Sequence, residues 1–169
     1  MTSYDFSCLN IPPQAGPLVE LAECLCSTIA ADCGLSLCWC GIYPGGVPAW
    51  DYCGGCSGGT CGMGYVSMDG ASLYTSFGSP TFGMMNCASL TQASVTIGVL
   101  RCMPMEEDGS PPDVETMADV AMLLMADMMA IRRAATCCFK GDLILGGYEP
   151  LGVSGGCTGG QWRATVALD

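Results

Sequence analysis

The sequence has no histidine and only five basic residues among its 169, of which Lys140 is the sole lysine. Without histidine, the chain lacks the commonest general base and the commonest metal ligand of proteins. The net charge of −11 also argues against the basic patch with which proteins bind nucleic-acid phosphates. We therefore expect no enzyme, no catalytic residues, no cofactor and no specific binding of DNA.

The sequence also lacks long apolar runs, and we expect no secretory leader. Mean hydropathy is +0.41, yet the longest apolar stretch is interrupted by Asp119 and Asp127 and is too short to cross a bilayer. The first five residues include no basic residue, and no apolar run follows them, which is unlike a secretory signal. The sequence predicts synthesis in the cytoplasm without insertion into a membrane.

Fourteen cysteines conflict with a purely cytoplasmic protein, because disulfides normally mark an oxidising compartment. Cys53 and Cys56 have the spacing of a zinc knuckle, and Cys38, Cys40 or Cys61 would complete a four-thiolate site. Only one pair has this spacing, however, and disulfides would staple the long loop around it. We favour disulfides or buried thiols over zinc, with a redox-active Cys53–Cys56 pair as a third alternative.

The strongest local pattern is a long amphipathic helix over residues 110–136. Ser110 is the predicted N-cap and Pro111 the first helical residue, and apolar side chains recur behind them at three- and four-residue steps. A second amphipathic helix is predicted over residues 17–33, where Gly34 provides the stop signal.

Strands are predicted where apolar and polar residues alternate, and loops where glycine, proline or charge gathers. The predicted strands cover 35–40, 62–68, 94–102, 142–148 and 161–168, and the predicted loops cover 43–62, 72–86, 103–109 and 150–160. The expected fold is α+β: a two-layer arrangement of a mostly antiparallel sheet packed by two amphipathic helices, with long Cys/Gly-rich loops. We expect a single domain over 1–169, made of an irregular N-terminal arm (1–16) and the α+β domain (17–169).

Two of these loops carry side chains suited to contacts with other subunits. The loop over 72–86 is apolar, and exposed apolar patches usually mark contact surfaces, although this loop could equally fold back onto the core. The turn over 103–109 is acidic. The predicted interface residues are Tyr74, Phe77, Phe82, Met84, Met85, Glu106, Glu107 and Asp108. Methionines around more than one face of the long helix favour a neighbouring subunit there too.

Several short motifs resemble a known family. They are VLRCMP at 99–104, IRRA at 131–134 with the cysteines at 137–138, GGYEPLG at 146–152 and GGCTGGQW at 155–162, with WCG at 39–41, PG at 44–45 and AWDYC at 49–53. Together these motifs resemble the neck or tail-completion proteins of long-tailed actinobacteriophages, and the order of the predicted elements also resembles that of tail terminators. The resemblance spans residues 33–168.

Membership of this family implies a structural virion protein. A tail terminator is a homo-oligomer, a hexameric ring that caps the tail tube and joins it to the head–tail connector. Its partners would be the tail tube protein and the connector or stopper protein, with DNA passing through the lumen unbound and no membrane involved. The protein would be assembled in the bacterial host cytoplasm and would function in the virion, where cysteines can oxidise. The alternatives are another neck or minor tail protein, such as a head-to-tail stopper, or a small cysteine-rich zinc-binding or redox protein.

Overall fold

The computed structural model of the chain describes residues 16–33, 37–46, 48, 62–76, 79–80, 90–104, 110, 112–154 and 156–168. At residues 32–33, 72–76, 79–80 and 90 it describes the backbone alone. The predicted arm therefore lies outside the described residues, except for Gly16, which is helical.

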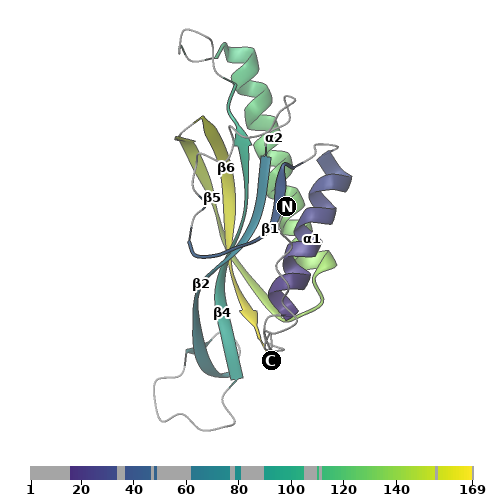
Figure 1. Ribbon diagram of the computed structural model, residues 1–169, viewed down its shortest axis with the longest axis vertical. Helices are drawn as coiled ribbons and strands as arrows, with labels where there is room; N and C mark the ends of the chain where they lie inside the picture. Colours follow the sequence, from purple (N-terminus) through teal and green to yellow (C-terminus); the bar gives the residue numbers. More distant parts are fainter. Residues whose placement is uncertain are drawn as a thin grey trace, which may run out of the picture.

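A twisted sheet forms one layer of the fold (Figure 1). Its strands are β1 (Trp39–Tyr43), β2 (Gly62–Ser76), β3 (Ser79–Pro80), β4 (Leu90–Cys102), β5 (Leu143–Ser154) and β6 (Cys157–Ala167). The strand order is β1-β2-β4-β6-β5, with β3 paired to β2 outside this path. All pairs are antiparallel except β1 with β2. A parallel pair needs a connection of about a dozen residues or more, and 18 residues separate the end of β1 from the start of β2.

Two helices form the second layer and cover one face of this sheet (Figure 1). They are α1 (Gly16–Cys33) and α2 (Val114–Arg133), and α2 continues into the π-helical turn η4 (Ala134–Cys138). Their inner faces meet alternate residues of the central strand β4, which are Val95, Ile97 and Val99. Residues of this shared core that come from the helices include Leu21, Leu25, Ile29, Ala130 and Ile131. The predicted α+β class, with a mostly antiparallel sheet and two amphipathic helices, is confirmed.

The start of α2 differs from the prediction. The N-cap is Asp113, whose carboxylate accepts a 2.7 Å hydrogen bond from the backbone N–H of Thr116. Ser110 therefore precedes the helix, which begins at Val114, and the predicted first helical residue, Pro111, lies outside the described residues. Because that hydrogen bond favours the charged carboxylate, the pKa of Asp113 is lowered. Ser110 and Asp113 both suit a cap, but the two residues after Ser110 are prolines without a backbone N–H, whereas every residue of the first turn after Asp113 has one.

Several strand boundaries also differ from the prediction. The strand predicted over 35–40 begins only at Trp39 and runs to Tyr43, and β2 continues through 72–76, where a loop was expected. The connection predicted over 150–160 is a tight hairpin instead, with Ser154 opposite Cys157. Gly156 has a φ of +77° in its turn, a conformation that favours glycine.

On each face of the sheet, a tyrosine ring lies against a glycine of a neighbouring strand. Tyr65 of β2 lies opposite Gly98 of β4, on the face away from the helices. Tyr148 of β5 reaches Gly160 of β6 on the helix face and packs at 5.6 Å from the ring of Trp162. A Cβ atom at either glycine would collide with the ring, so the missing side chain makes room for the aromatic one.

Candidate functional site

The cysteines around α1 form covalent cross-links between elements. Cys24 is bonded to Cys138 of η4, and Cys26 is bonded to Cys40 of β1, with Cα–Cα separations of 5.6 and 5.7 Å. One helix is thereby tied both to the end of the other helix and to an edge strand of the sheet. Cys38 and Cys157 are disulfide-bonded as well. Of the predicted cysteine cluster, the structure describes Cys38 and Cys40, and at both positions it supports the disulfide interpretation.

The same bonds bear on the alternative zinc site. Cys38 and Cys40, two of its five candidate ligands, are disulfide-bonded and do not offer thiolates. The other three predicted ligands, Cys53, Cys56 and Cys61, lie outside the described residues. Among the residues that are described, no group of three or more Cys, Asp or Glu side chains is arranged to hold a metal ion.

The predicted interface residues cannot be located in the structure. Phe77, Phe82, Met84, Met85, Glu106, Glu107 and Asp108 lie outside the described residues, and of Tyr74 only the backbone, in β2, is described. These residues stay a prediction. Separately, the structure contains no helix, over its described range, that is long and apolar enough to span a membrane.

A buried ion pair joins the sheet to α2. The Arg101 guanidinium of β4 donates two hydrogen bonds to the Asp127 carboxylate, Nε to Oδ2 at 2.8 Å and Nη2 to Oδ1 at 2.6 Å, and both side chains are almost fully buried. Burial, and secondarily the Asp127 charge, raises the pKa of nearby Tyr148. Since the bidentate pair engages both carboxylate oxygens, its chemistry suits positioning α2 rather than proton transfer.

The sequence analysis did not identify this pair. Arg101 lies in the apolar alternation of a strand, and Asp127 interrupts an apolar helical stretch. An acid and a base that both occupy core positions are the signal that could have paired them.

A row of polar side chains crosses the opposite face of the sheet. The Tyr65 hydroxyl donates to Gln161 Oε1 at 2.8 Å, and Gln161 Nε2 donates to Glu149 at 3.1 Å. Glu149 also pairs with the exposed Arg163 at 3.2 Å. Burial raises the pKa of Tyr65 far above its usual value, and the charges of Asp69 and Glu149 add to this effect. The phenol therefore stays protonated and acts as a hydrogen-bond donor.

Of the described helices, α2 exposes more large apolar side chains to solvent than α1 does. Met122 is 67% exposed, Met125 58% and Met129 48%, and Ala118 one turn earlier is exposed too. Soluble monomers seldom expose large apolar side chains in one contiguous group, and methionine adapts readily to partner surfaces. This face, defined here by Ala118, Met122, Met125 and Met129, is called the methionine face below.

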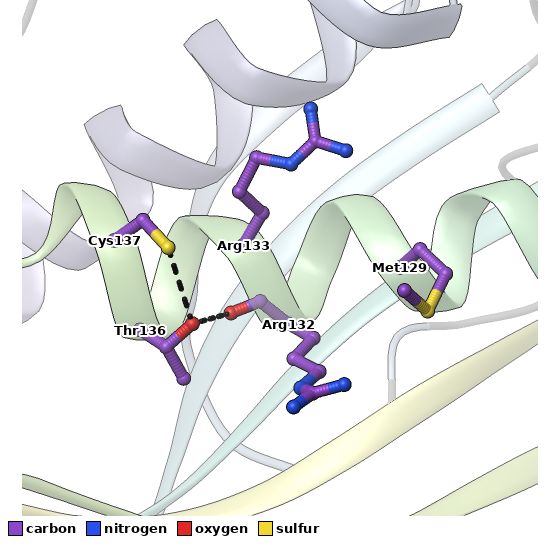
Figure 2. Close-up of a pocket in the computed structure, with 5 residues that line it drawn as sticks. All are labelled: Met129, Arg132, Arg133, Thr136 and Cys137. Carbon is purple, nitrogen blue, oxygen red and sulfur yellow. Dashed lines mark hydrogen bonds between the residues drawn. The ribbon is translucent and has the colours of Figure 1, made fainter.

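The methionine face ends at a shallow pocket of about 210 Å³ on the last turns of α2 and on η4. Figure 2 shows its lining residues, which are Met129, Arg132, Arg133, Thr136 and Cys137. Thr136 Oγ1 donates to the backbone carbonyl of Arg132 at 2.8 Å, and Cys137 carries a free, exposed thiol. With Lys140 nearby, three of the chain's five basic residues lie at this end of the helix.

The site is thus a helix surface that is apolar along its middle and cationic at its C-terminal end. Such a surface suits recognition of a partner with acidic and apolar side chains. In comparisons with known proteins, no protein-family model matches the sequence, and no curated protein matches it.

Proposed function

We propose that this chain is a structural protein of the phage head–tail connection, and specifically the tail terminator that caps the tail tube. The observation that carries the proposal is the pair of disulfides that bind α1 to η4 and to β1. Disulfides persist in proteins that function outside the reducing cytoplasm. A virion protein is assembled in the cytoplasm and then released with the particle, where cysteines can oxidise, and this fits the cross-links.

The same bonds weigh against the zinc-binding alternative. Because Cys38 and Cys40 are disulfide-bonded, only three of its five candidate ligands could still be thiolates, fewer than a four-cysteine site needs. The cross-links instead constrain the contacts of α1 with η4 and with β1, which suits a structural role.

The proposed role is to form a closed ring that ends the tail tube. Copies of the chain would close into a ring through a heterologous contact, one surface of each copy meeting a different surface of the next. We expect the segments 72–86 and 103–109 and the N-terminal arm to touch ring neighbours, the tail tube protein and the connector. The chain's charge of −11 would make such a ring strongly acidic, so that DNA phosphates pass its lumen without binding.

The test is to delete the gene from the phage genome that carries it and to image the lysate by electron microscopy. Overlong tails beside unjoined heads, restored to normal particles by the gene supplied on a plasmid, are the expected result. Tails of normal length beside unjoined heads would assign the stopper role instead. Intact infectious particles in the deletion strain would overturn the proposal.

A second measurement addresses the ring directly. Native mass spectrometry of the purified oxidised protein should give an assembly of about six times the 17.4 kDa chain mass when the tail tube protein is present. A zinc-bearing monomer under all conditions would instead support the metal-binding alternative.

A further inference from the structure

The methionine face belongs to a longer exposed stripe with a regular spacing. Exposed residues follow one another at steps of three and four: Glu115, Ala118, Met122, Met125, Met129, Arg132 and Thr136. This is the spacing of the contact positions of a coiled coil, where a stripe of side chains meets a second helix. The stripe is separate from the buried side of α2, which already packs on the sheet and α1 through Asp127, Ala130 and Ile131.

The stripe is also polarised in charge. Glu115 lies in the first turn of α2 and Arg132 in the last, with only alanine and methionine at the stripe positions between them. Both charged side chains are exposed. A partner that covers the whole stripe must therefore present a positive charge at one end, a negative charge at the other, and apolar side chains between.

A second copy of α2 in antiparallel orientation meets all three requirements. The two-fold axis then lies midway between Met122 and Met125, so that Met122 of each copy faces Met125 of the other copy. Ala118 then faces Met129, and Glu115 faces Arg132 of the other copy, at both ends of the pair. In a parallel arrangement like charges would lie side by side. The stripe is thus complementary to itself only when the helices run in opposite directions.

We propose that two copies of this chain associate through α2, packed antiparallel along the stripe from Glu115 to Arg132. The chosen occupant is a second copy because the charge pattern is self-complementary, a property that a contact with an unrelated partner does not require. Pairing removes six exposed methionine side chains from water, three from each copy, and this burial opposes the general repulsion between two acidic chains.

This contact goes beyond the proposed function. It is isologous, so it is complete with two copies, whereas a ring needs a heterologous contact. It would pair free subunits or join one ring to another, and it depends on neither a phage nor a tail tube. The two proposals can therefore fail independently.

The first test is sedimentation velocity of the full-length oxidised protein without partners, over a range of concentrations. We expect the wild type to reach twice the 17.4 kDa of one chain. Met125→Glu places two carboxylates next to the two-fold axis and should weaken pairing by roughly 100-fold. The matched control is Met68→Glu, an exposed methionine on β2, and this variant should pair like the wild type.

The second test is a charge reversal at the two ends of the stripe. Glu115→Arg and Arg132→Glu should each weaken pairing by roughly 10-fold, because each creates a like-charge contact at both ends of the dimer. The double variant restores opposite charges in the antiparallel arrangement and should regain wild-type pairing. Circular dichroism of every variant checks that α2 remains folded.

Three outcomes would overturn the inference. A wild type that stays monomeric at all concentrations would mean that the stripe is not a self-association surface. A dimer or ring that is unaffected by Met125→Glu would place self-association elsewhere on the chain. Failure of the double charge reversal to recover pairing, with the fold intact, would exclude the antiparallel register.

Discussion

The two halves of α2 both contain many apolar residues, but the C-terminal half is anchored to the rest of the fold and the N-terminal half is largely exposed to solvent. The C-terminal half is fixed by the ion pair of Asp127, by buried Ala130 and Ile131, and by the Cys24–Cys138 bond just beyond its end. In the N-terminal half, Val114 is 87% exposed and Met122 67% exposed, and Figure 1 shows the first turns of the helix standing beyond the ends of the strands.

This contrast shows that an apolar helical pattern does not say which part of a helix the fold will bury. Methionine and alanine occur in both halves of α2, yet the buried positions belong to the part that lies over β4 and β6. The first half must derive its stability from its own hydrogen bonds, from its cap and, in our proposal, from a second copy.

The sharpest test of the contrast compares two aspartates on the same helix. Asp127→Asn keeps the shape but removes the charge that compensates Arg101, so we expect a loss of about 3–5 kcal/mol in the free energy of unfolding. Asp119→Asn, at an exposed position, should change it by less than about 0.5 kcal/mol. Urea denaturation of the oxidised protein measures both. Equal losses of unfolding free energy would mean that the C-terminal half is not anchored by Asp127.

The next test compares apolar truncations. Ile131→Ala empties a fully buried site and should cost about 2–5 kcal/mol. Met125→Ala, 58% exposed in the single chain, should cost less than about 0.5 kcal/mol when measured at a concentration where the protein is monomeric. A large cost for Met125→Ala under those conditions would show that its face is covered within one chain.

Removing the bond at the end of the helix is expected to have a somewhat smaller effect. The Cys24→Ser/Cys138→Ser variant opens a link between residues 114 positions apart and should lose about 2–4 kcal/mol. Cys137→Ser is the matched control because this neighbouring thiol is free. Thermal unfolding without reductant should separate the two variants, and an unchanged midpoint for the double variant would show that the bond does not stabilise the fold.

The smallest effect is expected at the N-cap and depends on pH. Because the pKa of Asp113 is lowered in the folded protein, its contribution is present above the unfolded pKa and is lost as pH falls through the folded value. Asp113→Ala should therefore destabilise the protein at pH 7, with a difference from the wild type that shrinks as pH drops below the ordinary value of 3.8. A difference that stays constant down to pH 2 would contradict the cap assignment.

The fold class could be predicted from the sequence because its signals are local. The alternation through Val95, Ile97 and Val99 correctly placed the central strand, and the apolar repeat correctly placed both helices. Boundaries were less accurate where two residues suited the same role, as Ser110 and Asp113 did at the start of α2.

Features that depend on distant contacts could not be predicted in this way. The parallel pairing of β1 follows from the path of the chain between strands, and the disulfide partners follow from how α1 lies against η4 and β1. The burial of Asp127 depends on Arg101, 26 positions earlier in the chain. Spacing along the helix shows only that Asp127 interrupts an apolar stretch, since Arg101 belongs to a different element.

The two tyrosine–glycine contacts of the sheet have a consequence for the protein's evolution. Each ring occupies the space that a side chain on the neighbouring strand would fill. Gly98 and Tyr65 therefore constrain each other, and so do Gly160 and Tyr148. A larger residue in place of either glycine must be accompanied by a smaller residue in place of its tyrosine. Among homologous sequences, we expect these positions to vary in coupled pairs, and a lineage that loses the glycine alone should be rare.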